Sequence, residues 1–132
     1  MNILETEWWT IGVPPEWWAE HEDDVVVIGD RDDVGCIEVS TLQKEAGDFA
    51  PAELQQIARD NGESDWQWQP CGLGDFNGCC TSYEEEDTHV REWYVANSSV
   101  LLFITYSCDG ENGGLDDAAV DEILQTLALG VS

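Results

Sequence analysis

Apolar and polar residues alternate in the first patterned segment of the chain, EWWTIGV at residues 7–13. Alternation is typical of a strand whose two faces meet different surroundings, and here it places Trp9, Ile11 and Val13 on one face. Proline follows at position 14 and cannot donate to a sheet ladder, so we expect the strand to end there. The pattern therefore predicts an N-terminal strand with an apolar inner face.

Further strands are predicted along the rest of the chain. Apolar segments at residues 25–28 and 36–42 flank a turn-like segment at 29–33, and together they predict a hairpin. In the second half we expect a glycine-rich approach at residues 72–78 that leads into a strand at 79–86. Two further strands are predicted at 89–96 and 99–106. The last strand carries VLLFITY, which is apolar without alternation, so we expect it to be central and covered on both faces.

Two helices complete the predicted elements. The first begins near Pro51, because proline suits a first helical turn and Glu53 favours the N-terminal end. It ends at Asn61-Gly62, and its apolar stripe consists of Leu54, Ile57 and Ala58. After a loop at 109–114, the second helix begins at Asp116. Its apolar positions at helical spacing are Val120, Ile123, Leu124 and Leu127.

This order of elements predicts one α+β domain over residues 1–132, an antiparallel sheet flanked by helices. Together with the Pro-x-x-Trp turn in Val13-Pro14-Pro15-Glu16-Trp17, it resembles the PsbP-like fold from about Glu7 to Leu129. That group includes DcrB-like proteins, the PsbP photosystem subunits and a eukaryotic Ran-release factor. The resemblance implies a PsbP-like sandwich and a role as an accessory, chaperone-like or binding module, since these families share no catalytic residues.

The charge of the chain narrows the classes of possible partner most. The sequence has 29 acidic and four basic residues, which give a net charge of −25. Nucleic acid and anionic membrane surfaces are therefore excluded as partners, since phosphate binding needs clustered Lys and Arg. Hydrophobic residues make up 42% of the chain, with seven tryptophans, which excludes a disordered chain. The acidity fits two alternatives: adaptation to a saline host, or an acidic face that docks a basic partner.

Location and chemistry are predicted mainly by exclusion. No apolar run reaches the roughly 20 residues of a membrane span, and the first nine residues lack the basic start and lipidation cysteine of an exported lipoprotein. We therefore expect a cytoplasmic protein. The five cysteines form no C-x-x-C pair and are expected to be reduced structural thiols on a surface too acidic to activate a nucleophile. We predict no catalytic residues, metal site or cofactor, and no enzyme activity.

The contacts that this pattern predicts with a protein partner are aromatic and acidic. Tryptophan is enriched at interface hot spots, and a run of carboxylates near a strand end supplies charge, so the predicted binding residues are Trp8, Trp17, Trp18, Glu84, Glu85, Glu86 and Asp87. We predict an accessory protein-binding module. The alternatives are an immunity or inhibitor protein against a basic toxin or nuclease, and a small-molecule or cation-binding domain. The oligomeric state stays open.

Overall fold

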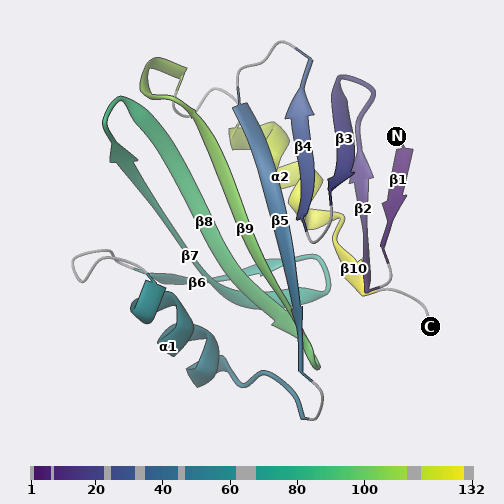
Figure 1. The fold of residues 1–132 in the computed structure, drawn as a ribbon, viewed down its shortest axis with the longest axis vertical. Helices are drawn as coiled ribbons and strands as arrows, with labels where there is room; N and C mark the ends of the chain where they lie inside the picture. Colours follow the sequence, from purple (N-terminus) through teal and green to yellow (C-terminus); the bar gives the residue numbers. More distant parts are fainter. Residues whose placement is uncertain are drawn as a thin grey trace.

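In the computed structural model, residues 2–6, 8–22, 25–31, 35–44, 47–61, 68–112 and 117–129 are described. They form a mostly antiparallel β structure with two short α-helices, in agreement with the α+β class (Figure 1). The elements in chain order are β1 (Asn2–Glu5), β2 (Trp9–Val13), β3 (Trp17–Glu22), β4 (Val25–Asp30), β5 (Gly35–Gln43), α1 (Pro51–Asn61), β6 (Gln69–Leu73), β7 (Phe76–Glu85), β8 (Thr88–Asn97), β9 (Val100–Asp109), the 3₁₀ helix η1 (Gly110–Asn112), α2 (Asp117–Gln125) and β10 (Ala128–Leu129). No helix among the described residues is long and apolar enough to cross a membrane.

Most of the chain belongs to one seven-stranded sheet with the order β3-β4-β5-β9-β8-β7-β6. Strand β9 is the middle strand, paired with β5 on one side and β8 on the other, and β1, β2 and β10 form a separate three-stranded sheet. The prediction of a central, apolar last strand is therefore confirmed. Leu101 and Leu102, neighbours with opposite side-chain directions in β9, are both fully buried, so both faces of the sheet are covered at this point.

One face of the large sheet, which we call the core face, packs against the small sheet and α2. Its side chains come from alternate positions such as Ile37 in β5 and Ile104 in β9, and each is fully buried. The predicted inner face of the N-terminal strand is confirmed, and all four predicted apolar positions of the second helix join the same core. The main core therefore consists chiefly of Trp9, Ile11, Val13, Trp17, Ile28, Ile37, Trp93, Ile104, Tyr106, Val120, Ile123, Leu124 and Leu127.

The other face of the large sheet, the outer face, carries α1 over part of β7 and β8. Leu54 and Ala58 are buried against Tyr94 and Leu101, with Ile57 partly buried beside them, so the predicted stripe faces the sheet. The helix begins with the backbone N–H of Ala50 donating to the Glu53 carboxylate at 3.2 Å. This contact satisfies one of the free amides at a helix N-terminus and fixes where α1 begins.

The largest error of the sequence prediction concerns residues 72–78, expected as a glycine-rich approach to the strand at 79–86. They form the tip of the β6–β7 hairpin, in which Leu73 pairs with Phe76 across a turn at Gly74 and Asp75. Gly74 has a left-handed φ of 60°, which the tight turn requires and which glycine adopts readily. Strands β1, β3, β6 and β10 were also not predicted.

Most of the remaining predictions agree with the structure or lie outside the part of the chain it describes. Gly29 and Asp30 of the predicted turn belong instead to β4, and residues 110–112 of the predicted loop form η1. Strands β4 and β5 form the predicted hairpin, with Val26 paired to Val39. The turn between these strands falls largely outside the described residues, at 32–34. The predicted first residue of the N-terminal strand, the predicted helix stop at Gly62 and the predicted helix start at Asp116 also lie outside them.

Candidate binding surface

The part of the outer face beyond α1 is the candidate site, and we call it the open sheet face. Strand register places alternate residues of β3, β4, β5, β9 and β8 side by side on it, and each of their side chains is half-buried or exposed. The open sheet face consists of Trp18, Glu20, Val27, Cys36, Glu38, Val90, Glu92, Thr105 and Ser107. Because the opposite faces of these strands form the main core, this surface is held on a rigid support.

Three carboxylates cross this face in one row, which we call the acidic row: Glu20, Glu38 and Glu92. Glu20 pairs with Val27 of β4, which in turn pairs with Glu38 of β5. Thr105 of β9 then stands between Glu38 and Glu92 of β8. Each acid is two strands from the next, so the spacing is about 10 Å. Apolar or hydroxyl side chains separate the charges, and the row therefore alternates charge with small, partly exposed contacts.

An aromatic side chain lies beside the acidic row. Trp18 pairs with Gly29 across β3 and β4, and its indole lies over the Gly29 backbone, where a Cβ at that position would overlap the ring. Its Nε1–H donates to the Asp30 carbonyl at 3.2 Å, which fixes the ring orientation. Trp18 is half-buried, so one side rests on the sheet and the other is accessible. A ring held in this way loses little freedom when it binds.

The four basic residues lie elsewhere and leave the acidic row unneutralised. Lys44 Nζ pairs with the Glu53 carboxylate at 2.6 Å at the start of α1. Arg91 is on the core face and pairs with Asp121 at 2.8 Å. The Arg31 side chain donates to a backbone carbonyl at the β3 end of the molecule, and Arg59 lies exposed on α1. None of these cations occupies a register position in the row.

The three predicted tryptophans do not form one surface. Trp17 is only 7% exposed and belongs to the main core, so its side chain offers no contact area to a partner. Trp18 points to the other face, as neighbours in a strand must. Trp8 precedes β2 and is partly buried against the main core. Of the three, Trp18 alone stands on the open sheet face.

The predicted acidic residues Glu84, Glu85, Glu86 and Asp87 form the tip of the β7–β8 hairpin. Glu86 and Asp87 occupy its turn with φ of 48° and 66°, which a two-residue I′ loop requires. The tip stands on β7 and β8, whereas Trp18 stands on β3, four to five strand spacings or about 19–24 Å away. The structure therefore separates the predicted aromatic contacts from the predicted acidic ones.

An open hollow of about 420 Å³ lies beside this tip, lined by Glu84, Asp87, Asp109, Gly110 and Glu111. His89 Nδ1 stands 4.0 Å from Glu84 and has no hydrogen-bond partner. Across the described ranges, no three His, Cys, Asp or Glu residues lie close enough together to hold a metal ion. The hollow is acidic, but its described groups do not converge on one point.

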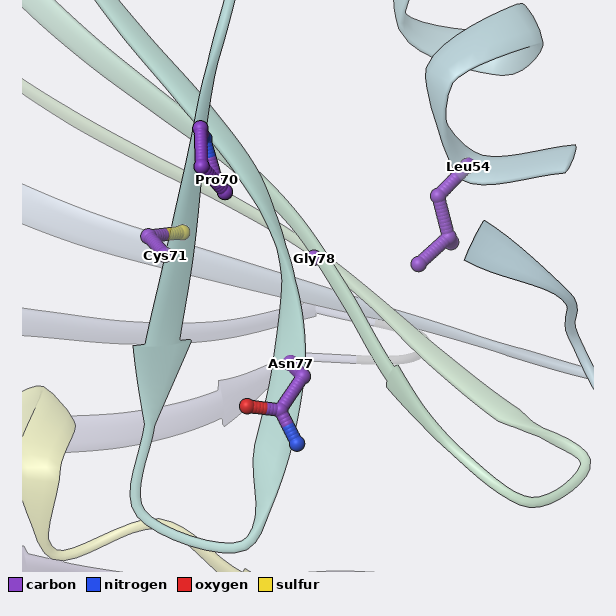
Figure 2. A pocket seen from close by; sticks show the side chains of 5 residues that line it. All are labelled: Leu54, Pro70, Cys71, Asn77 and Gly78. Atoms are coloured by element: carbon purple, nitrogen blue, oxygen red, sulfur yellow. The ribbon is translucent and has the colours of Figure 1, made fainter. Parts of the chain in front are cut away.

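A second open hollow, also about 420 Å³, lies between α1 and the β6–β7 hairpin. Figure 2 shows its lining, with Leu54 reaching from α1 toward the hairpin that carries Pro70, Cys71, Asn77 and Gly78. All five cysteines of the chain are free thiols. Cys79 and Cys108 are buried, as expected of structural thiols, whereas Cys36, Cys71 and Cys80 are partly exposed.

The acidic row was missed by sequence reasoning for a physical reason. Glu20 lies in a segment that was not recognised as a strand, because Trp17–Glu22 begins with two tryptophans and ends in charged residues. Glu38 and Glu92 lie in predicted strands but were not among the predicted binding residues. The row depends on strand order, and alternation within single strands carries no information about which strands are neighbours.

Comparison with known proteins shows the fold and no family. The sequence matches no protein-family model and no curated protein. A crystal structure from Bacteroides thetaiotaomicron is similar with a TM-score of 0.67 and 15% identity, over 95% of this chain and 46% of that one. This chain thus spans about half the length of the Bacteroides protein. LpqN of Mycobacterium tuberculosis, described as involved in cell envelope biogenesis, matches with a TM-score of 0.61 and 18% identity, over 93% of this chain and 83% of LpqN. At these identities the likeness extends to the fold alone.

Proposed function

We propose that this protein is a non-catalytic binding module that docks a basic segment of a partner protein on its open sheet face. The acidic row carries the proposal, because Glu20, Glu38 and Glu92 form an ordered line of carboxylates without a cation of the chain beside them. Complementary charge of this kind raises the rate of encounter and selects the partner. Trp18, at the end of the face, supplies the desolvated aromatic contact that charge alone does not provide.

The proposed kinship with PsbP-like proteins rests on the Pro-x-x-Trp turn. The backbone N–H of Trp17 donates to the Pro14 carbonyl at 3.0 Å, and the Trp17 ring enters the main core. Modules of that fold would act as accessory or chaperone-like proteins, which agrees with a docking surface. If the basic partner is a toxin, the docking module acts as an immunity or inhibitor protein. Rescue of cells that express the toxin would identify this role.

The cytoplasm is the location we propose, although a protein of similar fold, LpqN, is described with cell envelope biogenesis. Cell fractionation of the native host, with detection of the untagged chain, tests this location. Recovery in the soluble cytoplasmic fraction supports it, and recovery with the envelope overturns it without affecting the docking proposal.

The docking proposal is tested by affinity purification from the host, followed by calorimetric titration of the recovered partner. The acidic-row variant E20Q/E38Q/E92Q is compared with a hairpin-tip variant, E84Q/E85Q/E86Q, which changes the charge equally. We expect the acidic-row variant to weaken binding about tenfold or more and the tip variant to leave it nearly unchanged. Binding by the unmodified protein should also weaken as salt rises.

Three outcomes overturn the docking surface. If the tip variant alone loses binding, the hairpin tip of the original prediction is the site. If both variants bind as the unmodified protein does, neither acidic surface docks the partner. A protein that recovers no stoichiometric partner at low salt leaves adaptation to a saline host as the explanation of the acidity.

A further inference from the structure

Two cysteines of the β6–β7 hairpin lie against each other on the core face, opposite the open sheet face. Cys71 pairs with Gly78, and Gln69 pairs with Cys80, so the cysteines are diagonal neighbours on adjacent strands. Their side chains are hydrogen-bonded to each other, and both pack at the partly exposed margin of the main core. Figure 2 shows the Cys71 sulfur directed from β6 toward β7.

Arg91 brings a positive charge to this pair. Its guanidinium lies 4.7 Å from the centre of the Trp93 ring, and Trp93 is directly opposite Cys80 in the β7–β8 register. Ion pairs to Asp117 and Asp121 of α2, at 3.5 and 2.8 Å, hold the guanidinium in place. The surroundings of Cys80 therefore differ from the acidic surface that the composition predicts.

In the hydrogen bond between the two side chains, the Cys71 thiol is the donor and the Cys80 sulfur is the acceptor. The hydrogen bond from Cys71, assisted by Arg91, lowers the pKa of Cys80 to about 7 against burial and the Asp121 charge. The same hydrogen bond and burial raise the pKa of Cys71, which stays protonated. Near neutral pH the pair thus holds one thiolate and one thiol, the arrangement that thiol–disulfide exchange requires.

We propose that Cys71 and Cys80 form a thiol-oxidation site that a low-molecular-weight disulfide converts reversibly into an intramolecular disulfide. The Cys80 thiolate attacks one sulfur of the small disulfide, whose S–S bond breaks and releases the first small thiolate. Cys71 gives up its proton to that thiolate and attacks the Cys80 sulfur, and the second small thiolate leaves. The two protein sulfurs are oxidised to a disulfide, and the small disulfide is reduced to one thiol, which carries the Cys71 proton, and one thiolate.

The neighbouring cysteines make the assignment specific. Cys79 is adjacent to Cys80 in sequence but points to the outer face, where it is buried under α1 and burial raises its pKa. Cys36 is on β5, and burial together with Glu38 raises its pKa. Strand β6 ends the sheet and is paired in it only with β7, so it can adjust as the sulfur–sulfur bond forms.

The test treats the reduced protein with oxidised glutathione at pH 7, counts free thiols and maps the crosslink by mass spectrometry. Cleavage before Asp75 separates Cys71 from Cys80, so a disulfide appears as two joined fragments. We expect two of the five thiols to be lost, with the joined fragments retained in Cys79→Ser and absent in Cys71→Ser and Cys80→Ser. Excess reduced glutathione should restore all five thiols.

A second readout does not depend on the crosslink. Iodoacetamide should modify Cys80 first, with half-maximal rate near pH 7, and Arg91→Gln should move this midpoint upward. Retention of five thiols in oxidised glutathione overturns the proposal. So does a crosslink that persists in Cys80→Ser, or first modification of Cys79. Because the unmodified chain supplies the thiol count and the order of modification, a variant that fails to fold does not remove the test.

Discussion

Two adjacent tryptophans of one strand lie on opposite faces of the sheet and therefore have different roles. Trp17 and Trp18 follow each other in β3, and alternation turns one into the main core and the other onto the open sheet face. Truncation of a buried Trp17 to alanine is expected to cost about 3–5 kcal/mol of stability. A residue type that is common at interfaces thus identifies a binding contact only after the face it occupies is known.

The packing of the Trp18 ring on Gly29 gives a prediction for single residues. Gly29→Ala should destabilise the protein by about 1–3 kcal/mol, because the new methyl group overlaps the indole. In a Trp18→Ala background Gly29→Ala should cost little stability, because the indole ring that the new methyl group would overlap is absent. Urea unfolding of both single variants and the double variant measures this coupling. Costs that simply add would show that the ring does not rest on the glycine.

At the scale of elements, the β6–β7 hairpin tip is joined to the end of α2 by several polar contacts. The Asp75 amide donates to the Leu127 carbonyl at 3.0 Å, and Gln125 Nε2 donates to the Gly72 carbonyl at 2.7 Å. A Cβ at Gly74 would overlap the Leu127 carbonyl. The turn therefore docks backbone against backbone and connects the large sheet to the region of the small one.

Gly74→Ala tests this docking, and Gly47→Ala is its matched control. Both glycines have positive φ, 60° and 83°, so both substitutions carry a backbone cost of about 1–2 kcal/mol. Space around Gly47 is open, whereas Gly74 contacts α2's end. We expect Gly74→Ala to cost about 1–3 kcal/mol more than Gly47→Ala in urea unfolding. Equal losses of stability in the two variants would mean that the turn at Gly74 shifts to accommodate the methyl group without strain.

The start of α1 carries a pH-dependent contact. Hydrogen bonds from Lys44 and from the Ala50 amide lower the pKa of Glu53 below its usual value of 4.5. A lowered folded-state pKa adds stability above the unfolded pKa, and this stability is lost as pH falls through the folded value. Glu53→Gln should therefore destabilise the protein at pH 7 and lose this effect in acid.

Urea midpoints of the unmodified protein and Glu53→Gln between pH 7 and pH 3 measure the difference. Lys44→Gln removes the same ion pair from its other side and should show the same pH profile. A difference that stays constant over this range would show that the variant acts through helix propensity instead of charge.

The sequence predicted elements where the local pattern is decisive. Alternation in Trp9–Val13 and the stripe of α2 identified buried positions correctly, because both reflect the local geometry of one element. Strand β3 was missed, since its polar half faces solvent near a sheet edge and resembles a loop. The acidic row was not predicted, because β3 was not recognised as a strand and because the β5–β9 pairing joins strands that are far apart in the chain.

For the whole molecule, a net charge of −25 means that folding brings many carboxylates together without cations to offset them. The range of this repulsion depends on salt, since the Debye length falls from about 30 Å at 0.01 M to about 3 Å at 1 M. The acidic row is one local part of this effect. At about 10 Å in water, each neighbouring pair of its charges repels by roughly 0.4 kcal/mol.

Salt should therefore raise the free energy of unfolding, while it weakens docking to a basic partner. We expect E20Q/E38Q/E92Q to be more stable than the unmodified protein at 0.01 M salt, by up to about 1 kcal/mol, and equal to it at 1 M. Urea midpoints at both salt concentrations measure this. A gain that persists at 1 M would come from packing and not from relief of repulsion.

The pairing of β2 with β10 sets the order in which the molecule can be completed during synthesis. Thr10 pairs with Ala128, and α2 supplies core side chains only shortly before that point in the chain. While the ribosome is still adding the last third of the chain, Ile11 and Val13 therefore lack part of their final cover. The β7–β8 and β8–β9 pairings join strands that follow each other directly in the chain, so this meander can form earlier. A nascent chain halted before residue 117 should accordingly remain open to proteolysis at its N-terminal strands, and the full chain should complete the small sheet in a late step.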